Sequence, residues 1–301
     1  MFKLISLILC SAFFSNNIAA QNNGILPLSG IKYFNEGLHA KYAEVTIDGA
    51  TVLSNRIPAN KEFILKIQLP TGFTEDASKK VYPAVEIIFL SAKNIPLLSL
   101  PNPIKDLEKT GIPLSSFKEL PLKLILQNQW LKNEKECIVQ IRIYDLKSKK
   151  NMRLIFPVSV AAATEPLAIS RLTNVIKTSD ESIGLSNALK MNIASIMVDT
   201  SIRVAPKNAY LSIDMPGITG TTMNEVLNGT NTFWVYDKNM NEIKIPDKLL
   251  KKVGGSLEDN LVNYTLKIPF RLKTDMNRGY TIRFRWESTD RKKIIDIVST
   301  K

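Results

Sequence analysis

The sequence predicts an all-β protein of two tandem β-sandwich domains that follow an N-terminal signal peptide. Three observations support this fold class. Apolar and polar residues alternate with a period of two through most of the 301-residue chain, which is the pattern of strands that bury one face. Helical periodicity is confined to two short segments. Several strand-like segments of the first half recur in the second half in the same order.

The recurrence indicates one module used twice. Residues 62–70 resemble residues 209–216, and residues 131–143 share Leu, Lys, Ile and Arg positions with residues 272–284. The offset falls from 146 residues at the first pair to 141 at the second, as small loop deletions would produce, because loops absorb length changes at little thermodynamic cost. The alternative is that two unrelated β-domains share the generic alternation of strands.

The first twenty residues have the features of a secretory signal peptide. One basic residue, Lys3, precedes an apolar run over residues 4–14, and small residues precede Gln21. We expect cleavage after Ala20 and export to the periplasm or cell surface. A lipid on Cys10 is the alternative, but Leu9 stands where lipoprotein signals carry a small residue. Apolar runs of transmembrane length are missing, so no membrane span is predicted.

Removal of residues 1–20 leaves Cys137 as the single cysteine, so the mature chain has no intramolecular disulfide and is stabilised by packing. We expect Cys137 to be a buried core residue. The net charge of residues 21–301 is +11, divided as +6 before residue 161 and +5 after it. Such an even excess disfavours nucleic acid and favours contact with anionic lipopolysaccharide, acidic glycan or phospholipid.

Turn signals separate six or seven short strands in each repeat, which is typical of β-sandwiches. The short stretch 161–166 is the expected linker, so the domains are predicted at 21–162 and 163–301. Short helices are expected at 104–110 and 247–253, before Gly111 and Gly254. The strands are expected at 42–47, 62–69, 84–90, 120–127, 136–144 and 152–160, then at 191–198, 209–215, 231–236, 262–270, 280–286 and 293–299.

The last two long strands of the second repeat provide the candidate binding surface. If 262–270 and 280–286 form a hairpin, its polar face carries four basic side chains that could hold an anionic partner. The competing interpretation is that they keep an exposed sheet soluble. Trp130, beside polar residues near a strand end, is the candidate for stacking on a glycan. The four basic residues are Lys267, Arg271, Arg283 and Arg285.

Catalytic, metal and cofactor sites are not predicted. A zinc site needs three or four ligands, and the mature chain has one histidine, His39, and one cysteine. A nucleophile elbow and a glycine-rich phosphate loop are both missing. Carboxylate pairs for glycoside hydrolysis stay open, because such partners are spaced in three dimensions rather than in sequence.

In this architecture the chain resembles bacterial envelope proteins with tandem immunoglobulin-like β-sandwich domains, over essentially the whole mature sequence. It lacks the Cys…Trp…Cys framework of antibody-type domains. The resemblance implies a non-catalytic binding or scaffold protein that engages an envelope protein or glycan. The alternative function is a hydrolase that acts on envelope polysaccharide.

Overall fold

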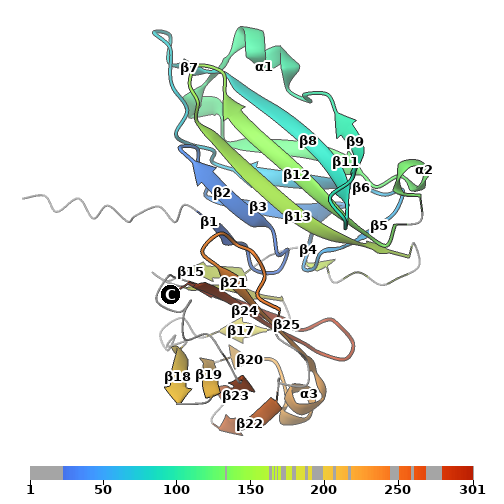
Figure 1. Cartoon of the computed structure of the whole chain (residues 1–301), viewed down its shortest axis with the longest axis vertical. Helices are drawn as coiled ribbons and strands as arrows, with labels where there is room; N and C mark the ends of the chain where they lie inside the picture. The colour runs from blue at the N-terminus through green and yellow to red at the C-terminus, as the bar shows by residue number, and fades with distance from the viewer. Residues whose placement is uncertain are drawn as a thin grey trace, which may run out of the picture.

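The computed structural model confirms an all-β protein, in sheets that are almost entirely antiparallel (Figure 1). Within the described chain, no helix is both long and apolar enough to cross a membrane. The predicted signal peptide lies outside the described residues. These are 23–132, 134–162, 165, 167, 169–170, 174–177, 181–186, 189–191, 199–205, 208–215, 218–244, 251–258, 261–268 and 280–300.

The first module, formed by β1 to β14, is a sandwich of two sheets. One sheet has the order β1 (Asn23–Ile25), β2 (Lys32–Glu36), β13 (Asn151–Ala161), β12 (Glu136–Asp145), β8 (Pro83–Ser91) and β9 (Pro96–Leu100), with β5 (Arg56–Pro58) beside β13. The other has the order β11 (Glu119–Ile125), β6 (Glu62–Gln68), β3 (Tyr42–Ile47), β4 (Ala50–Val52) and β14 (Ile169–Ser170). A short pair, β7 (Lys80–Val81) and β10 (Ile112–Pro113), closes one end.

The core of the first module lies between its two sheets. Period-two alternation turns every second residue of each long strand inward, and the inward side chains of both sheets form one apolar cluster. Phe63 on β6 meets Phe156 on β13 edge to face, with ring centroids 6.5 Å apart. Cys137 belongs to this cluster, as predicted from its place in an apolar pattern.

The second module, formed by β15 to β25, also has two main sheets. One has the order β15 (Asn174–Lys177), β16 (Glu181–Leu185), β25 (Ile294–Thr300), β24 (Tyr280–Glu287) and β21 (Thr230–Asp237). The other has the order β18 (Asp199–Ala205), β19 (Asn208–Met215), β23 (Leu261–Ile268) and β22 (Lys251–Glu258), and a short pair joins β17 (Lys190–Met191) to β20 (Ile218–Thr219).

Strand order supports the duplication. The sheet order β1, β2, β13, β12, β8 in the first module corresponds to β15, β16, β25, β24, β21 in the second. The order β3, β6, β11 likewise corresponds to β18, β19, β23. Matched strands also follow one another in the same sequence along the chain. Both pairs of recurring segments fall on matched strands, β6 with β19 and β12 with β24.

One of the two predicted helices is present. The helix α1 (Lys105–Thr110) ends at Gly111, whose φ of 59° suits glycine. The second prediction, 247–253, is wrong from residue 251 onward, because this segment is strand β22 paired with β23. Two helical segments and one 3-10 turn were not predicted: α2 (Asn128–Leu131), α3 (Met223–Asn228) and η1 (Leu114–Ser116).

The two modules are stacked along the long axis of the molecule (Figure 1). β14 pairs with β4, so the sheets of the first module extend to Ser170, past the expected boundary at residue 162. The end of the first module that carries β1 and β4 lies against the β15 to β25 sheet of the second. Of the four charged side chains that are buried in the described part of the chain, three lie at this junction.

Candidate functional site

Two arginines on β24 form the centre of the junction between the modules. Arg283 and Arg285 are each only 8% exposed, and both donate to the Asp296 carboxylate on β25, which is fully buried. The closest nitrogen–oxygen distances are 2.6 Å from Arg283 and 3.3 Å from Arg285. Both side chains also donate to main-chain oxygens of the first module, so this cluster ties the two modules together.

The contacts with the first module are made to two loops. Arg285 donates to the carbonyl oxygens of Leu28 at 3.0 Å and Leu53 at 2.7 Å, and Arg283 donates to that of Leu28 at 3.3 Å. Hydrogen bonds to charged donors contribute more than neutral ones. The arginines therefore satisfy carbonyl groups that the tight loops leave without a strand partner.

Close packing seats the first of these loops on the second module. Gly30 has a φ of 71°, and a Cβ there would lie 2.4 Å from the Arg283 guanidinium. A Cβ on Gly184 would likewise lie 2.5 Å from the Leu28 side chain. Leu28 is buried together with Leu53 and Ile294 from the two sides of the junction. The two glycines thus allow approach distances that no other residue permits.

Opposing effects set the charge state of the arginine pair. Burial alone would lower the pKa of Arg283, but the adjacent Asp296 carboxylate outweighs it and raises the pKa above its ordinary value. For Arg285 burial dominates and lowers the pKa, although Asp296 partly offsets it. Glu287 lies 3.3 Å from Arg285. Two cations therefore face two carboxylates, which is the balance a buried cluster needs.

The prediction that these arginines lie on an exposed sheet face is wrong. The alternation itself is confirmed, because Ile282, Phe284 and Trp286 point into the second module's core. The opposite face is not open to solvent, because the first module covers it. Arg283 also lies over the Trp234 ring, 4.7 Å from its centroid.

The proposed hairpin is also wrong. β23, which carries Lys267, pairs with β19 and β22, whereas β24 pairs with β21 and β25. Lys267 and Arg283 consequently belong to different sheets of the sandwich. Arg271 lies outside the described residues. The basic surface expected from these strands is therefore not assembled by the described part of the chain.

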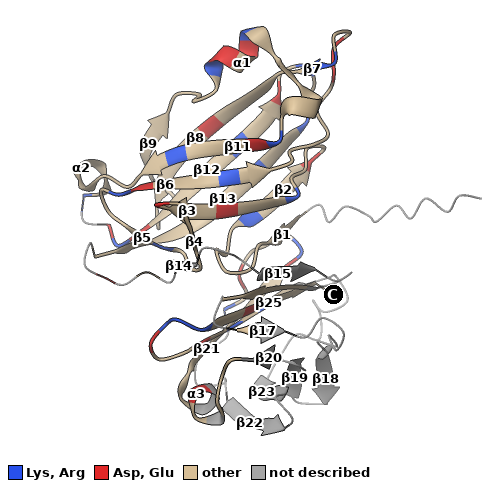
Figure 2. Cartoon of the chain, turned by 180° about the vertical axis from the view of Figure 1, so that it is seen from behind, with Lys and Arg blue, Asp and Glu red and all other residues tan. Residues whose placement is uncertain are grey.

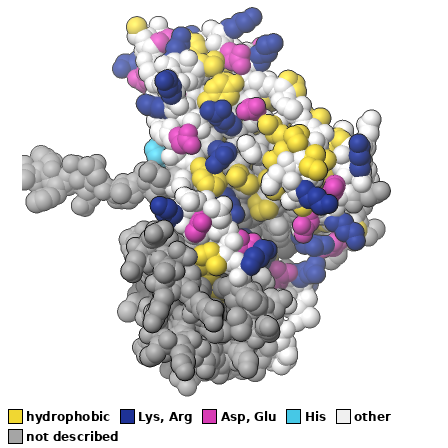
Figure 3. Space-filling view, in the orientation of Figure 1, with side chains coloured by type: hydrophobic (Ala, Val, Ile, Leu, Met, Phe, Trp, Pro, Cys, Tyr) yellow, Lys and Arg dark blue, Asp and Glu magenta, His cyan; other side chains and the backbone are white. Residues whose placement is uncertain are grey.

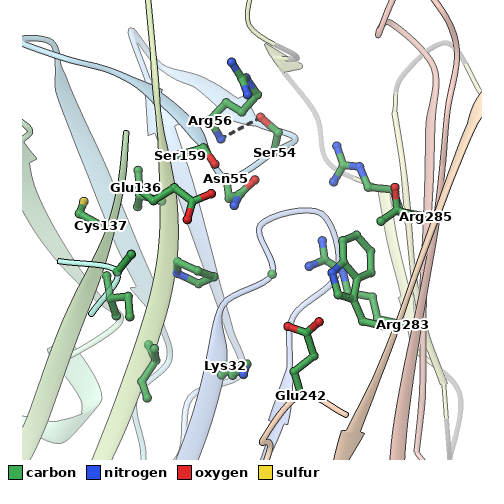
Figure 4. Close-up of a pocket in the computed structure, with 18 of the residues that line it drawn as sticks. Lys32, Ser54, Asn55, Arg56, Glu136, Cys137, Ser159, Glu242, Arg283 and Arg285 are labelled. Atoms are coloured by element: carbon green, nitrogen blue, oxygen red, sulfur yellow. Dashed lines mark hydrogen bonds between the residues drawn. The ribbon is translucent and has the colours of Figure 1, made fainter. Parts of the chain in front are cut away.

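A cleft of about 560 Å³ opens beside the arginine cluster, between the two modules (Figure 4). One wall is the outer face of β12 and β13, and the other is formed by β21 and β24 of the second module. Both walls carry polar and apolar side chains. The lining includes Lys32, Asn55, Arg56, Glu136, Ile138, Ile155, Pro157, Ser159, Thr232, Trp234, Glu242 and Arg291.

The cations around the cleft are already engaged. Arg56 holds Glu165 with two hydrogen bonds of 2.6 Å, and Arg291 donates to the same carboxylate at 3.0 Å. Lys32 donates to the carbonyl oxygen of Met240 at 2.8 Å, and burial lowers its pKa. These bonds bridge the modules a second and a third time. The cleft walls are accordingly held in fixed positions.

Hydrogen bonds shift the pKa values of several described carboxyl groups. Where their pKa values shift, the shift is downward, because hydrogen bonds from neighbouring groups stabilise the carboxylate, as Arg56 does for Glu165. A general acid at neutral pH needs the opposite shift. Within the residues that can be described, no cluster of three metal-ligating side chains occurs. His39 is half-buried and its backbone bridges to Thr71.

Trp130, the predicted glycan platform, lies on α2, which precedes β12 in the first module. The ring is half-buried against the core, with its centroid 4.7 Å from that of Phe89 and a tilt of 53°. Its packing accounts for much of the apolar ring surface. Stacking on a sugar stays a prediction.

Comparison with known proteins does not assign the chain to a family: no family model matches it, and no curated protein is significantly similar to it.

The junction between the modules was not predicted from the sequence. One signal was present, because Asp296 interrupts the apolar run 294–298, and a carboxylate in such a run needs a buried cation as partner.

Proposed function

We propose that this chain is a non-catalytic binding or scaffold protein, exported to the periplasm or cell surface, that engages an envelope protein. The two modules act as one rigid body in this proposal. One surface of the first module, continuous with the cleft, receives the partner. The observation that supports this proposal is a difference in exposure between corresponding faces of the two repeated modules.

The two modules have corresponding sheet faces, of which one is covered and the other is exposed. In the second module, the row Trp234, Arg283 and Val298 crosses β21, β24 and β25, and the first module covers it. The corresponding row in the first module is Glu86, Arg142 and Arg153. Both Glu86 and Arg142 are exposed. A face that one copy buries against a module is left open in the other.

The open face is apolar enough to receive a protein. Its register places Leu90, Ile138 and Pro157 in one row across β8, β12 and β13, and Ile88, Gln140 and Ile155 in the next. All six side chains are half-buried. An apolar patch with a charged border is typical of protein interaction sites. We use the name open face for these six residues together with Glu86, Arg142 and Arg153.

A hollow at the upper end of the open face would receive a side chain of the partner. It measures about 370 Å³ and is lined by Glu86, Arg142, Tyr144 and Ser99, among others. The Arg142 guanidinium lies 5.8 Å from the centroid of the Tyr144 ring and makes no ion pair with a described residue. It is therefore available to pair with a carboxylate.

We also propose that each module is immunoglobulin-like, in the sense that it consists of two packed, mainly antiparallel sheets. Its strand order differs from the ABED and CFG order of immunoglobulin constant domains. Fold analogy gives function only by association, so the proposal rests on the open face.

A hydrolase that acts on envelope polysaccharide is the second candidate, because Glu136, Glu242 and Glu287 line the cleft. Binding to an envelope glycan would also use the cleft. Both alternatives predict that a soluble polysaccharide protects the cleft from chemical modification. Turnover of that polysaccharide would establish the hydrolase.

Site-specific photocrosslinking in intact cells tests the proposal. A photoreactive residue at Ile138 on the open face should capture a discrete envelope protein. The matched control is Ile125, an exposed apolar residue on β11 in the opposite sheet, which should capture none. Equal capture at both positions, or none at Ile138, would show that the open face is not the binding surface.

A further inference from the structure

Two turns with the same sequence lie at the end of the first module that is remote from the second (Figure 1). One contains Ser78-Lys79-Lys80 and precedes β8, and the other contains Ser148-Lys149-Lys150 and joins β12 to β13. Each turn is built on an aspartate. Asp76 accepts from the backbone of Ser78 and Lys80, and Asp145 accepts from the backbone of Lys147 and the hydroxyl of Ser148.

Tyr82 joins the two turns into one surface. Its hydroxyl donates to Asp76 at 2.6 Å, and its carbonyl oxygen accepts from the backbone of Leu146 at 3.0 Å. The Lys147 ammonium lies over the Tyr82 ring, 4.4 Å from the centroid. Lys80 reaches from the first turn to the carbonyl oxygen of Thr110 at the end of α1. The turns are therefore held side by side.

Most of the lysine charge on this surface is not neutralised. Lys79 pairs with Glu75, but Lys80 and Lys150 donate to carbonyl oxygens, which carry no net charge. Among the described residues, Lys147 and Lys149 make no ion pair. The two aspartates are committed to the turns. Glu36 accepts from the Asn151 side chain beside the second turn, and Asp106 and Glu108 lie on α1. We name Lys79, Lys80, Leu146, Lys147, Lys149 and Lys150 the lysine tip. The ribbon of Figure 2 is blue at several basic positions around this end, and Figure 3 shows basic side chains there.

In the matching hairpin of the second module, basic residues are paired with carboxylates. The β24 to β25 turn contains Arg291, Lys292 and Lys293. Arg291 pairs with Glu165, and Lys293 pairs with Glu225 at 2.6 Å. Basic residues at this position are thus used for ion pairs inside the second module and across the junction. Their counterparts in the first module face solvent.

Leu146 adds an exposed apolar side chain to the lysine tip. Its side chain is 44% exposed, although it lies at the turn between two long strands with a well-packed core beneath them. A leucine flanked by lysines is the combination that binds at the boundary between lipid headgroups and acyl chains. A soluble polyanion would make no use of it.

We propose that the lysine tip docks the protein on a lipid surface that carries phosphate headgroups. The ammonium groups contact the phosphates, and Leu146 enters the boundary beneath them. Because the lysine tip lies at the far end of the first module, docking leaves the open face and the cleft accessible to a partner. This inference goes beyond the proposed function and does not depend on it.

Vesicle sedimentation of the mature chain, residues 21–301, tests this inference. The parent protein should bind vesicles of phosphatidylcholine with 30% phosphatidylglycerol, and bind pure phosphatidylcholine weakly. Each lysine near an anionic surface contributes about a five-fold change in affinity. The double variant Lys147→Gln/Lys149→Gln should therefore bind about 25-fold more weakly. The control Lys93→Gln/Lys135→Gln removes the same charge from exposed sites at the other end of the sandwich, and should change binding less than two-fold.

A third variant distinguishes lipid from other polyanions. Leu146→Ser should weaken vesicle binding several-fold but leave binding to heparin, a soluble polyanion, unchanged. Equal losses in the tip and control double variants would overturn the inference, since binding would then follow net charge alone. It would also be overturned if heparin bound while anionic vesicles did not. Neither outcome bears on crosslinking at Ile138, so failure here is distinguishable from failure of the proposed function.

Discussion

Replacing Asp296 by Asn tests the junction between the modules. The carboxylate is fully buried and pairs with both Arg283 and Arg285. Asn has nearly the same shape but no charge, so the substitution leaves two buried cations facing only the partly exposed Glu287. Breaking a buried pair in this way costs about 3–5 kcal/mol. That is a large part of the 5–15 kcal/mol typical of folded domains.

The assay is urea unfolding followed by far-UV circular dichroism and tryptophan fluorescence. With an m-value of about 3 kcal/mol/M, the loss lowers the unfolding midpoint by about 1 M or more. The matched control is Asp48→Asn, which removes an exposed pair with Lys61 whose side chains are 74% and 43% exposed. Pairs of that kind contribute about 0–1 kcal/mol.

Two outcomes would refute this reasoning. A loss below about 1 kcal/mol in Asp296→Asn would mean that the buried cluster does not hold the modules together. Equal losses in the two variants would mean that the effect is not specific to burial. A triple variant, Arg283→Met/Arg285→Met/Asp296→Leu, should recover part of the stability, because apolar replacement of a whole buried cluster is often neutral or stabilising.

Two further predictions follow from the same region and from the core. Gly30→Ala should destabilise the protein by about 1–3 kcal/mol in the same urea assay, because the residue has a positive φ and its Cβ would meet the Arg283 guanidinium. In the control Gly49→Ala, the glycine also has a positive φ, but its Cβ would meet nothing within 4 Å. Equal losses of stability in the two variants would assign the effect to backbone strain alone. Burial raises the pKa of the Cys137 thiol to about 12. The folded mature chain, residues 21–301, should therefore not react with a thiol reagent at pH 8 and should react fully in urea; rapid labelling of the folded chain would contradict the burial.

The strands could be predicted because their signal is local. In 280–286 the alternation of apolar and polar residues states which side chains share a face, and the structure agrees. The turn at Gly111 was equally readable, because a glycine at a positive φ ends α1. α3 could have been found from Thr222 and Glu225, which form a capping box with the T-x-x-E spacing.

Partners across the sheets could not be read in the same way. β23 and β24 are consecutive along the chain and both alternate, which suggests a hairpin, but they belong to opposite sheets of the sandwich. Pairing between strands depends on contacts distant in sequence, such as Ile213 with Tyr264 in β19 and β23. Residues 251–253 were predicted as the end of a helix because Gly254 matches Gly111 in the first repeat, whereas they belong to β22, which pairs with β23.

The site was missed for a different reason. Alternation shows that Arg283 and Arg285 share a face, but it cannot show what covers that face. In the first module the corresponding Arg142 is exposed, and in the second the counterpart is buried by the loops of Leu28 and Leu53. The difference arises from the placement of one module on the other.

Measuring the distance between the modules in solution tests the central claim most directly. Spin labels at Lys123→Cys and Lys292→Cys, in residues 21–301 with Cys137→Ala, place one probe on an exposed position of each module. Pulsed electron paramagnetic resonance should give a single narrow distance distribution, and Asp296→Asn should broaden it. A broad or multiple distribution without that substitution would contradict a rigid pair of modules joined by the arginine cluster.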